Sequence, residues 1–216
     1  MKTRCHSGFT RNELIIVFGV VVLIALALFP LIRSGVESAV ATNMKSRSRG
    51  VWIAVVSANS ERAPAGLKSV WPKELGFDAS RTSTEYFRWL MSDSNGVIAA
   101  DAQDQVCSDL KPDMLGGAGV PVAVSATAFS RANNAWNVLC VGEETRSDAP
   151  LFVSRNVDWG RQASTSTPVS LTDEMPFRHR RLVWTTRGGG IFDARIKYLP
   201  MLREAIGTNV LEVMRP

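Results

Sequence analysis

Residues 8–32 of this chain read GFTRNELIIVFGVVVLIALALFPLI, and the rest of the sequence is interpreted outward from this stretch. Its last nineteen residues, 14–32, carry no charge. As a helix they are about 28 Å long, which matches a hydrocarbon core of about 30 Å. The stretch therefore predicts a membrane-spanning helix. It also leaves Glu13 to be explained, because a carboxylate beside lipid is costly unless something pairs with it.

Basic residues ahead of the apolar run predict its orientation. Lys2, Arg4 and Arg11 precede it, so the positive-inside rule places the N-terminus in the cytoplasm and the chain beyond residue 32 outside. Cys107 and Cys140 then lie where disulfides persist, and we expect a disulfide between them. The alternative is two buried thiols that act as small hydrophobes.

Two ordinary interpretations compete for the N-terminus. A secretory signal peptide accounts for the basic start and for Ala25-Leu26-Ala27, which is similar to an A-x-A cleavage site. However, the uncharged run continues to residue 32, and signal peptides do not normally carry an acid such as Glu13. A plain single-pass anchor explains the length of the run and leaves Glu13 unexplained.

Gly8-Phe9-Thr10 followed by Glu13-Leu14 resembles the processing site of type IV pilins and of the pseudopilins of type II secretion systems. The resemblance implies that a prepilin peptidase cuts after Gly8 on the cytoplasmic side and that Phe9 becomes the N-methylated first residue. Pro30 falls where many pilins carry a helix-bending proline. Arg11 and Asn12 depart from the family, which usually has apolar residues there.

In this family Glu13 would be an assembly residue, whose carboxylate pairs with the free amine of a neighbouring subunit's first residue. Such pairs are best known for fixing register. The implied partners are the prepilin peptidase, other pilin or pseudopilin subunits, an inner-membrane assembly platform and membrane lipid. The implied location is the bacterial inner membrane, with the globular domain in the periplasm. A type II secretion pseudopilin is favoured, and a true pilin stays open.

The helical pattern continues beyond the apolar run. Apolar residues recur four or seven positions apart to about residue 58, at Val36, Val40, Met44, Val51 and Val55. The other face carries Glu37, Lys45, Arg47 and Arg49, and we expect the three basic side chains to be a solvated face. Further on, Thr82 to Glu85 forms a capping-box pattern, and Gly188 to Gly190 predicts a hairpin turn after the β-rich run 181–186. Residues 163–170 are expected to be a loop.

The predicted fold class is α+β: a long N-terminal helix, transmembrane and then amphipathic, packed on a small antiparallel β-sheet domain. The expected boundaries are a leader at 1–8, the helix at 9–60 with its membrane segment at 14–32, and a globular domain at 61–216. Composition agrees with a folded domain, since 45% of residues are hydrophobic, 21% are charged and six are tryptophans.

We expect no enzyme activity, cofactor or metal. The sequence contains no G-x-S-x-G, H-E-x-x-H or P-loop pattern, and His179 is the only histidine after the leader. Asp93-Ser94-Asn95-Gly96 lacks the remainder of a calcium loop, and we interpret it as a turn. The acidic residues Asp101, Asp104, Asp109 and Asp113 are a second possible source of calcium ligands, which we interpret as solvated carboxylates. Nucleic acid is not expected, because the net charge of +5 falls to +3 without Lys2 and Arg4. The alternative function is a signal-peptide-bearing or membrane-anchored periplasmic binding protein or enzyme that does not polymerise.

Overall fold

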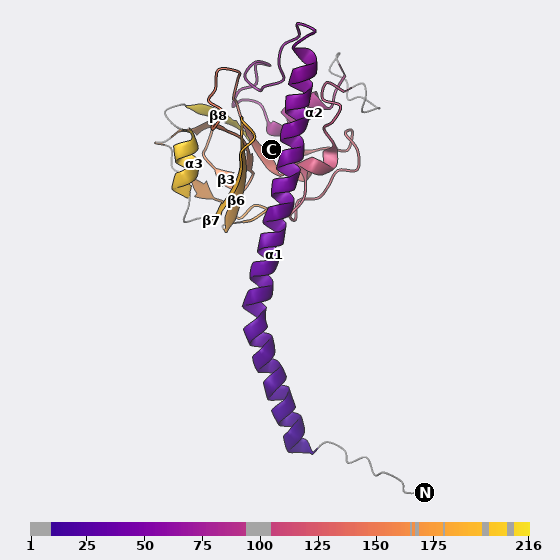
Figure 1. Ribbon diagram of the computed structural model, residues 1–216, viewed down its shortest axis with the longest axis vertical. Coiled ribbons are helices and arrows are strands. Elements are labelled where there is room, and N and C mark those ends of the chain that lie inside the picture. Colours follow the sequence, from indigo (N-terminus) through magenta and orange to yellow (C-terminus); the bar gives the residue numbers. More distant parts are fainter. Residues whose placement is uncertain are drawn as a thin grey trace, which may run out of the picture. The chain divides into compact units, whose positions relative to one another are not determined.

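The computed structural model of the chain describes residues 10–93, 105–164, 166, 169–178, 180–195, 199–206 and 210–216. The chain divides into two compact units, residues 1–40 and 41–216. One helix, α1 (Arg11–Arg62), has residues in both units (Figure 1). It is helical through Pro30, Ser34 and Gly35, so the prediction of a single long N-terminal helix is confirmed.

The other regular elements all belong to the second unit. Its helices are α2 (Ser83–Leu90), α3 (Leu199–Ile206) and two 3₁₀ turns, at Pro112–Leu115 and Arg131–Asn133. Its strands are β1 (Trp136–Leu139), β2 (Pro150–Ser154), β3 (Val157–Asp158), β4 (Gln162–Ala163), β5 (Ser170–Leu171), β6 (Arg181–Thr186), β7 (Ile191–Arg195) and β8 (Leu211–Met214). The predicted α+β class is therefore confirmed.

Six of the strands form one sheet in the order β4-β8-β1-β2-β6-β7, and every pairing in it is antiparallel. The longest ladder joins β6 to β7, with Trp184 opposite Phe192. The turn between these strands contains Gly188 to Gly190, as the glycine run predicted. β3 and β5 pair separately. Residues 163–170 were expected to be a loop, but both ends of that segment enter strands, at β4 and β5.

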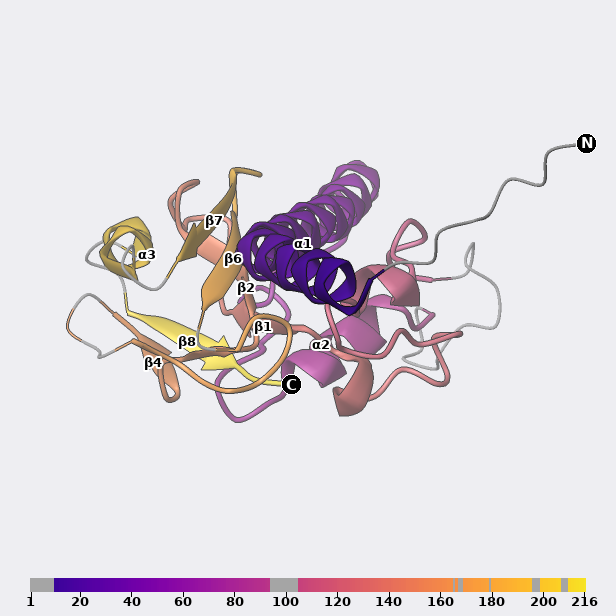
Figure 2. The same ribbon diagram turned by 90° about the horizontal axis from the view of Figure 1, so that it is seen from below.

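Helices cover both faces of the six-stranded sheet (Figures 1 and 2). The part of α1 that belongs to the second unit lies on one face, beside β6 and β7. Its inward stripe is buried and follows the helical period, at Ala41, Met44, Ser48, Val51 and Val55. The predicted apolar face is thus right from Met44 onward. Val36 precedes this stripe, belongs to the first unit and is 58% exposed.

Aromatic side chains from distant parts of the domain form its core. The ring of Phe87 on α2 lies 5.8 Å from that of Phe152 on β2 and 6.4 Å from that of Phe129, measured between centroids. α2 begins with the predicted capping box, in which Thr82 Oγ1 accepts from the Glu85 N–H at 3.1 Å and Glu85 Oε2 accepts from the Thr82 N–H at 2.8 Å. The cap fixes where α2 starts, and with it the placement of Phe87.

Candidate functional site

The first turn of α1 is closed by a second capping box. Thr10 stands immediately before the helix, and its hydroxyl oxygen accepts a hydrogen bond from the Glu13 N–H at 3.3 Å. In return, Glu13 Oε2 accepts from the Thr10 N–H and from the Thr10 hydroxyl, each at 2.8 Å. This is the T-x-x-E pattern of Thr82 and Glu85 repeated at the start of the chain. The sequence contained this signal, and our sequence analysis missed it.

The capping box gives Glu13 an explanation within the chain. A carboxylate three residues after the cap satisfies N–H groups that would otherwise lack partners, and it lies at the positive end of the helix dipole. Glu13 is exposed, and among the described residues only Oε2 accepts hydrogen bonds, which leaves Oε1 available to a partner. Gly8 and Phe9, the expected processing site, lie outside the described residues.

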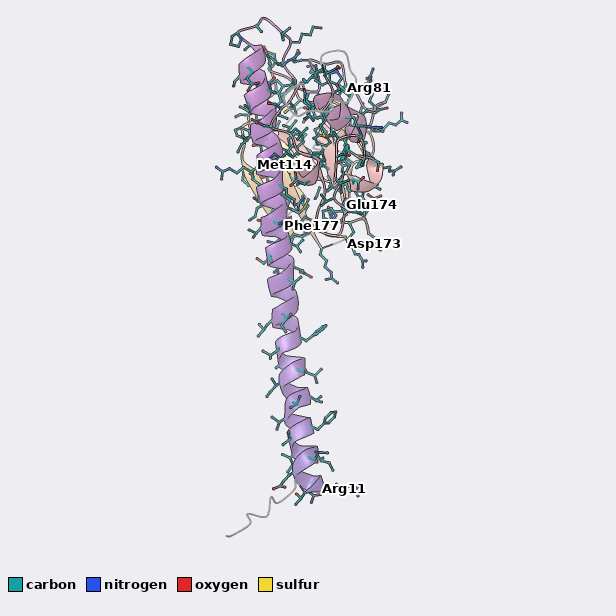
Figure 3. The ribbon with its side chains drawn as sticks, turned by 90° about the vertical axis from the view of Figure 1, so that its right-hand side faces the viewer. Arg11, Arg81, Met114, Asp173, Glu174 and Phe177 are labelled. Atoms are coloured by element: carbon teal, nitrogen blue, oxygen red, sulfur yellow. The ribbon has the colours of Figure 1, made fainter. Side chains whose placement is uncertain are left out.

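The apolar run forms an uncovered part of α1. Its large apolar side chains, from Leu14 to Ile32, are between 39% and 70% exposed wherever the structure describes them. Figure 3 shows these side chains standing out from the ribbon all round the helix. Within the described part of the chain, α1 is the one helix long and apolar enough to cross a membrane. By length and composition alone, a signal sequence meets the same criterion.

The free energy gained by inserting residues 14–32 into a membrane exceeds the cost of the charged residues beside them. Residues 14–32 contain fifteen Leu, Ile, Val or Phe, which together favour insertion by about 5 to 9 kcal/mol. An acidic side chain at the bilayer centre opposes insertion by about 3 kcal/mol, and less at the edge where Glu13 stands. Glu13 and Arg11 therefore do not prevent the segment from entering lipid.

The outer part of α1 is fixed to the β6–β7 hairpin by polar contacts one helical turn apart. Lys45 Nζ lies 2.7 Å from Asp193 Oδ1 on β7. Ser48 Oγ accepts from the Thr185 hydroxyl at 2.7 Å, and Trp52 Nε1 donates to the Arg187 carbonyl at 2.9 Å. These three contacts fix the rotation of α1 about its own axis, because all of them form only when Lys45, Ser48 and Trp52 face the hairpin.

Arg47 fixes a loop of the domain to α1. Its guanidinium donates to the carbonyl oxygens of Asp113 and Gly116, and its Nε donates to Asn43 at 2.8 Å. The expectation that Lys45 and Arg47 belong to a solvated face is therefore wrong, since both hold partners far away in the sequence. Arg49 is exposed, as expected.

Cys107 and Cys140 are both free and buried, so the expected disulfide between them is not formed. The fold holds the two thiols on separate elements. The Cys107 N–H bonds to the Leu90 carbonyl at the end of α2, whereas the Cys140 N–H bonds to Glu212 on β8. Burial raises the pKa of each thiol to about 12, so neither is an activated nucleophile.

The described residues contain no cluster of three or more His, Cys, Asp or Glu side chains that could hold a metal ion. Three residues considered as calcium ligands, Asn95, Asp101 and Asp104, lie outside the described residues. So does His179, the histidine considered for acid–base chemistry.

Comparison with known proteins gives this chain no relative. No family model, no curated protein and no solved structure matches it.

Proposed function

We propose that this protein is a structural subunit of a pilin-like filament, most consistent with a type II secretion pseudopilin. The subunit is inserted in the bacterial inner membrane through residues 14–32, trimmed after Gly8 by a prepilin peptidase, and carries its globular domain in the periplasm. It polymerises through packing of its N-terminal helices with sibling subunits, on an inner-membrane assembly platform.

One observation carries the proposal. A single helix begins at a capped T-x-x-E sequence beside a glycine–phenylalanine pair, continues as an uncovered apolar segment, and then becomes a buried stripe of its own domain. A signal peptide has no need for that continuity, because cleavage near Leu28 would remove the first part of the helix. Bundled apolar helices would cover the segment, and Oε1 of Glu13 is free to accept a neighbour's terminal amine.

Two matched variants separate assembly from capping. Glu13→Gln removes the charge but keeps an amide that can complete the capping box, whereas Thr10→Ala removes the cap but keeps the charge. If Glu13 pairs between subunits, Glu13→Gln abolishes filaments while Thr10→Ala still yields them at a reduced level. Filaments are measured by shearing cells and sedimenting the polymer, with total subunit and processed subunit quantified in parallel.

The opposite result for the two variants would contradict the proposal. If Glu13→Gln assembles normally and Thr10→Ala does not, the carboxylate serves only to cap the helix.

A second function is favoured by the same capping box, because an intrachain role for Glu13 needs no filament. In this alternative the protein is a membrane-anchored binding module that never polymerises. Neither variant would then change its sedimentation, and the N-terminal leader would remain on the chain.

A further inference from the structure

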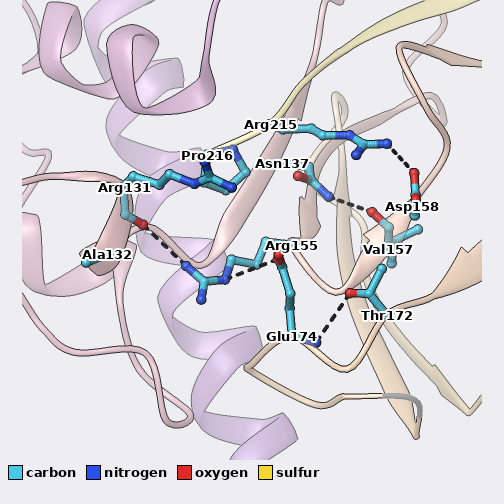
Figure 4. A pocket seen from close by; sticks show the side chains of 10 residues that line it. All are labelled: Arg131, Ala132, Asn137, Arg155, Val157, Asp158, Thr172, Glu174, Arg215 and Pro216. Carbon is cyan, nitrogen blue, oxygen red and sulfur yellow. Dashed lines mark hydrogen bonds and ion pairs between the residues drawn. The ribbon is translucent and has the colours of Figure 1, made fainter.

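Two cavities adjoin each other in the globular domain, one of about 440 Å³ and one of about 410 Å³. Arg131, Arg215 and Pro216 line both, so the two form one groove on the surface of the second unit. Figure 4 shows the larger one, where Arg131 approaches from the 3₁₀ turn before β1 and Arg155 from the residue after β2. Each cavity is within the size range of ordinary ligand sites.

Arginine dominates this groove. Five arginine side chains line it, against two acidic side chains, Asp158 and Glu174. The smaller cavity has no aspartate or glutamate among its lining residues. We call this surface the arginine groove and define it by Arg81, Arg131, Arg155, Arg161 and Arg215.

Two of the five guanidiniums are held in place by the fold. Arg155 donates to the carbonyl oxygens of Asn134 at 3.0 Å and Met175 at 3.1 Å, with Glu174 at 3.7 Å. Arg215 pairs with Asp158 and donates to the Gly160 carbonyl at 3.1 Å. These contacts account for both acidic side chains of the groove, so neither of them neutralises the remaining arginines.

The guanidiniums of Arg131 and Arg161 are available to a ligand. Arg131 and Arg161 are exposed, and within the described ranges their side chains take part in no hydrogen bond or ion pair. Arg81 is exposed and lies over the ring of Phe77, 5.1 Å from its centroid. A guanidinium presents a fork of donors that matches a carboxylate or phosphate in two-point contact.

The residues that line the groove indicate which kind of anion it binds. Its positive charge extends over two joined cavities, which suits a chain with several anionic groups better than a single ion. No aromatic side chain lines either cavity, so the stacking platforms of single-strand nucleic-acid sites are absent from the described lining.

We propose that the arginine groove binds an acidic peptide segment of a partner protein. Carboxylates of the segment pair with Arg131 and Arg161, while the fixed guanidiniums of Arg155 and Arg215 shape the floor. This site is independent of filament assembly, because it lies entirely within residues 79–216 and uses none of the groups of α1.

Fluorescence anisotropy of a labelled octaglutamate peptide tests the proposal, with the full-length protein in detergent micelles at low salt. The variant Arg131→Gln/Arg161→Gln removes two unpartnered charges. Its matched control, Arg88→Gln/Arg195→Gln, removes two exposed arginines outside the groove. We expect the groove variant to weaken binding by about tenfold or more and the control to stay near the wild-type affinity. Binding of the wild type should also weaken as salt is added.

Both variants should unfold at the same temperature as the wild type, which would show that a loss of binding is not caused by a loss of folding. Three outcomes would overturn the proposal. They are no saturable binding of octaglutamate up to about 1 mM, equal affinities for the groove variant and its control, and equal binding of an octaglutamine peptide. Tighter binding of a deoxythymidine oligonucleotide with the same dependence on Arg131 and Arg161 would assign the groove to nucleic acid and exclude the peptide.

Discussion

Asp193 on β7 links α1 to β6 through its carboxylate. Its carboxylate accepts from Lys45 on α1 and from Arg181 Nε on β6, the latter at 2.9 Å. Burial by itself would raise the pKa of Asp193, but the hydrogen bonds from Lys45 and Arg181 outweigh burial and lower that pKa below its ordinary value of 3.8. The charged form is therefore the one the fold stabilises.

Asp193→Asn is expected to lower the free energy of unfolding of the globular domain by about 1 to 3 kcal/mol at pH 7, because it leaves two cations without their partner. The stabilisation from a carboxyl with a lowered pKa is complete above pH 3.8 and is lost as the pH falls through the folded value. Wild type and variant should thus converge as the pH falls below the lowered pKa of Asp193. Guanidinium titrations followed by tryptophan fluorescence measure both effects.

The control for Asp193 is Asp148→Asn. Asp148 forms its ion pair with Arg146 in an exposed turn, where such pairs contribute little. Its loss should stay within about 0.5 kcal/mol. Equal losses for the two variants would mean that the Lys45 and Arg181 contacts do not stabilise the domain.

The two buried cysteines should be unreactive in the folded protein. With a pKa of about 12, each thiol is almost entirely protonated at pH 8, and burial also keeps reagents away. Iodoacetamide should leave Cys107 and Cys140 unmodified in the native protein and modify both in guanidinium without reductant, as read by peptide mass mapping. If unfolding exposes no thiol until reductant is added, the two form a disulfide after all.

At the scale of elements, the tip of the β6–β7 hairpin rests on α1. Gly189 has a φ of +88°, and a Cβ built on it would lie 2.6 Å from Cζ2 of Trp52. Gly160 offers a matched comparison, since its φ is +69° but nothing lies within 4 Å of its Cβ position. The two sites share the backbone requirement for glycine and differ in the neighbour.

Gly160→Ala is expected to destabilise the domain by about 1 kcal/mol through backbone strain alone. Gly189→Ala should lose a further 1 to 3 kcal/mol, approximately, because its methyl group displaces the Trp52 ring. Urea titrations of the two variants give the comparison. Losses of the same size would show that the hairpin tip does not press on α1.

The elements that local sequence signals specify were predicted, and those that depend on remote partners were not. A cap such as Thr82 and Glu85, or a glycine turn such as 188–190, is complete within a few residues, so it can be read from the chain. β8 pairs with β1 through Val138 and Met214, and nothing local in either strand indicates the other. The partners of Lys45 and Arg47 were missed for the same reason, since Asp193 is 148 residues away from Lys45.

The part of the candidate site that is continuous in the sequence could be predicted. The apolar run and Glu13 follow from sequence order, and even the missed cap between Thr10 and Glu13 was within reach. The arginine groove was not, because its five arginines come from four separate stretches of the chain between residues 81 and 215. The fold alone brings them together.

On the scale of the whole molecule, the chain combines an exposed apolar N-terminal segment with a second unit, residues 41–216, whose buried core includes none of the described residues of that segment. The core of residues 41–216 contains its own helix stripe, aromatic cluster and sheet. The surrounding that we propose for this segment is first lipid and then the helices of neighbouring subunits.

The central claim is the processing of this segment, and the most direct test is the intact mass and N-terminal sequence of the protein from its native membrane fraction. We predict a chain that begins at Phe9 and carries one added methyl group, which would make Glu13 the fifth residue of the mature subunit. A chain that begins near Leu28 would contradict this account and identify residues 1–27 as a signal peptide. A chain that still carries Met1 or Lys2 would contradict it as well and would leave a simple membrane anchor.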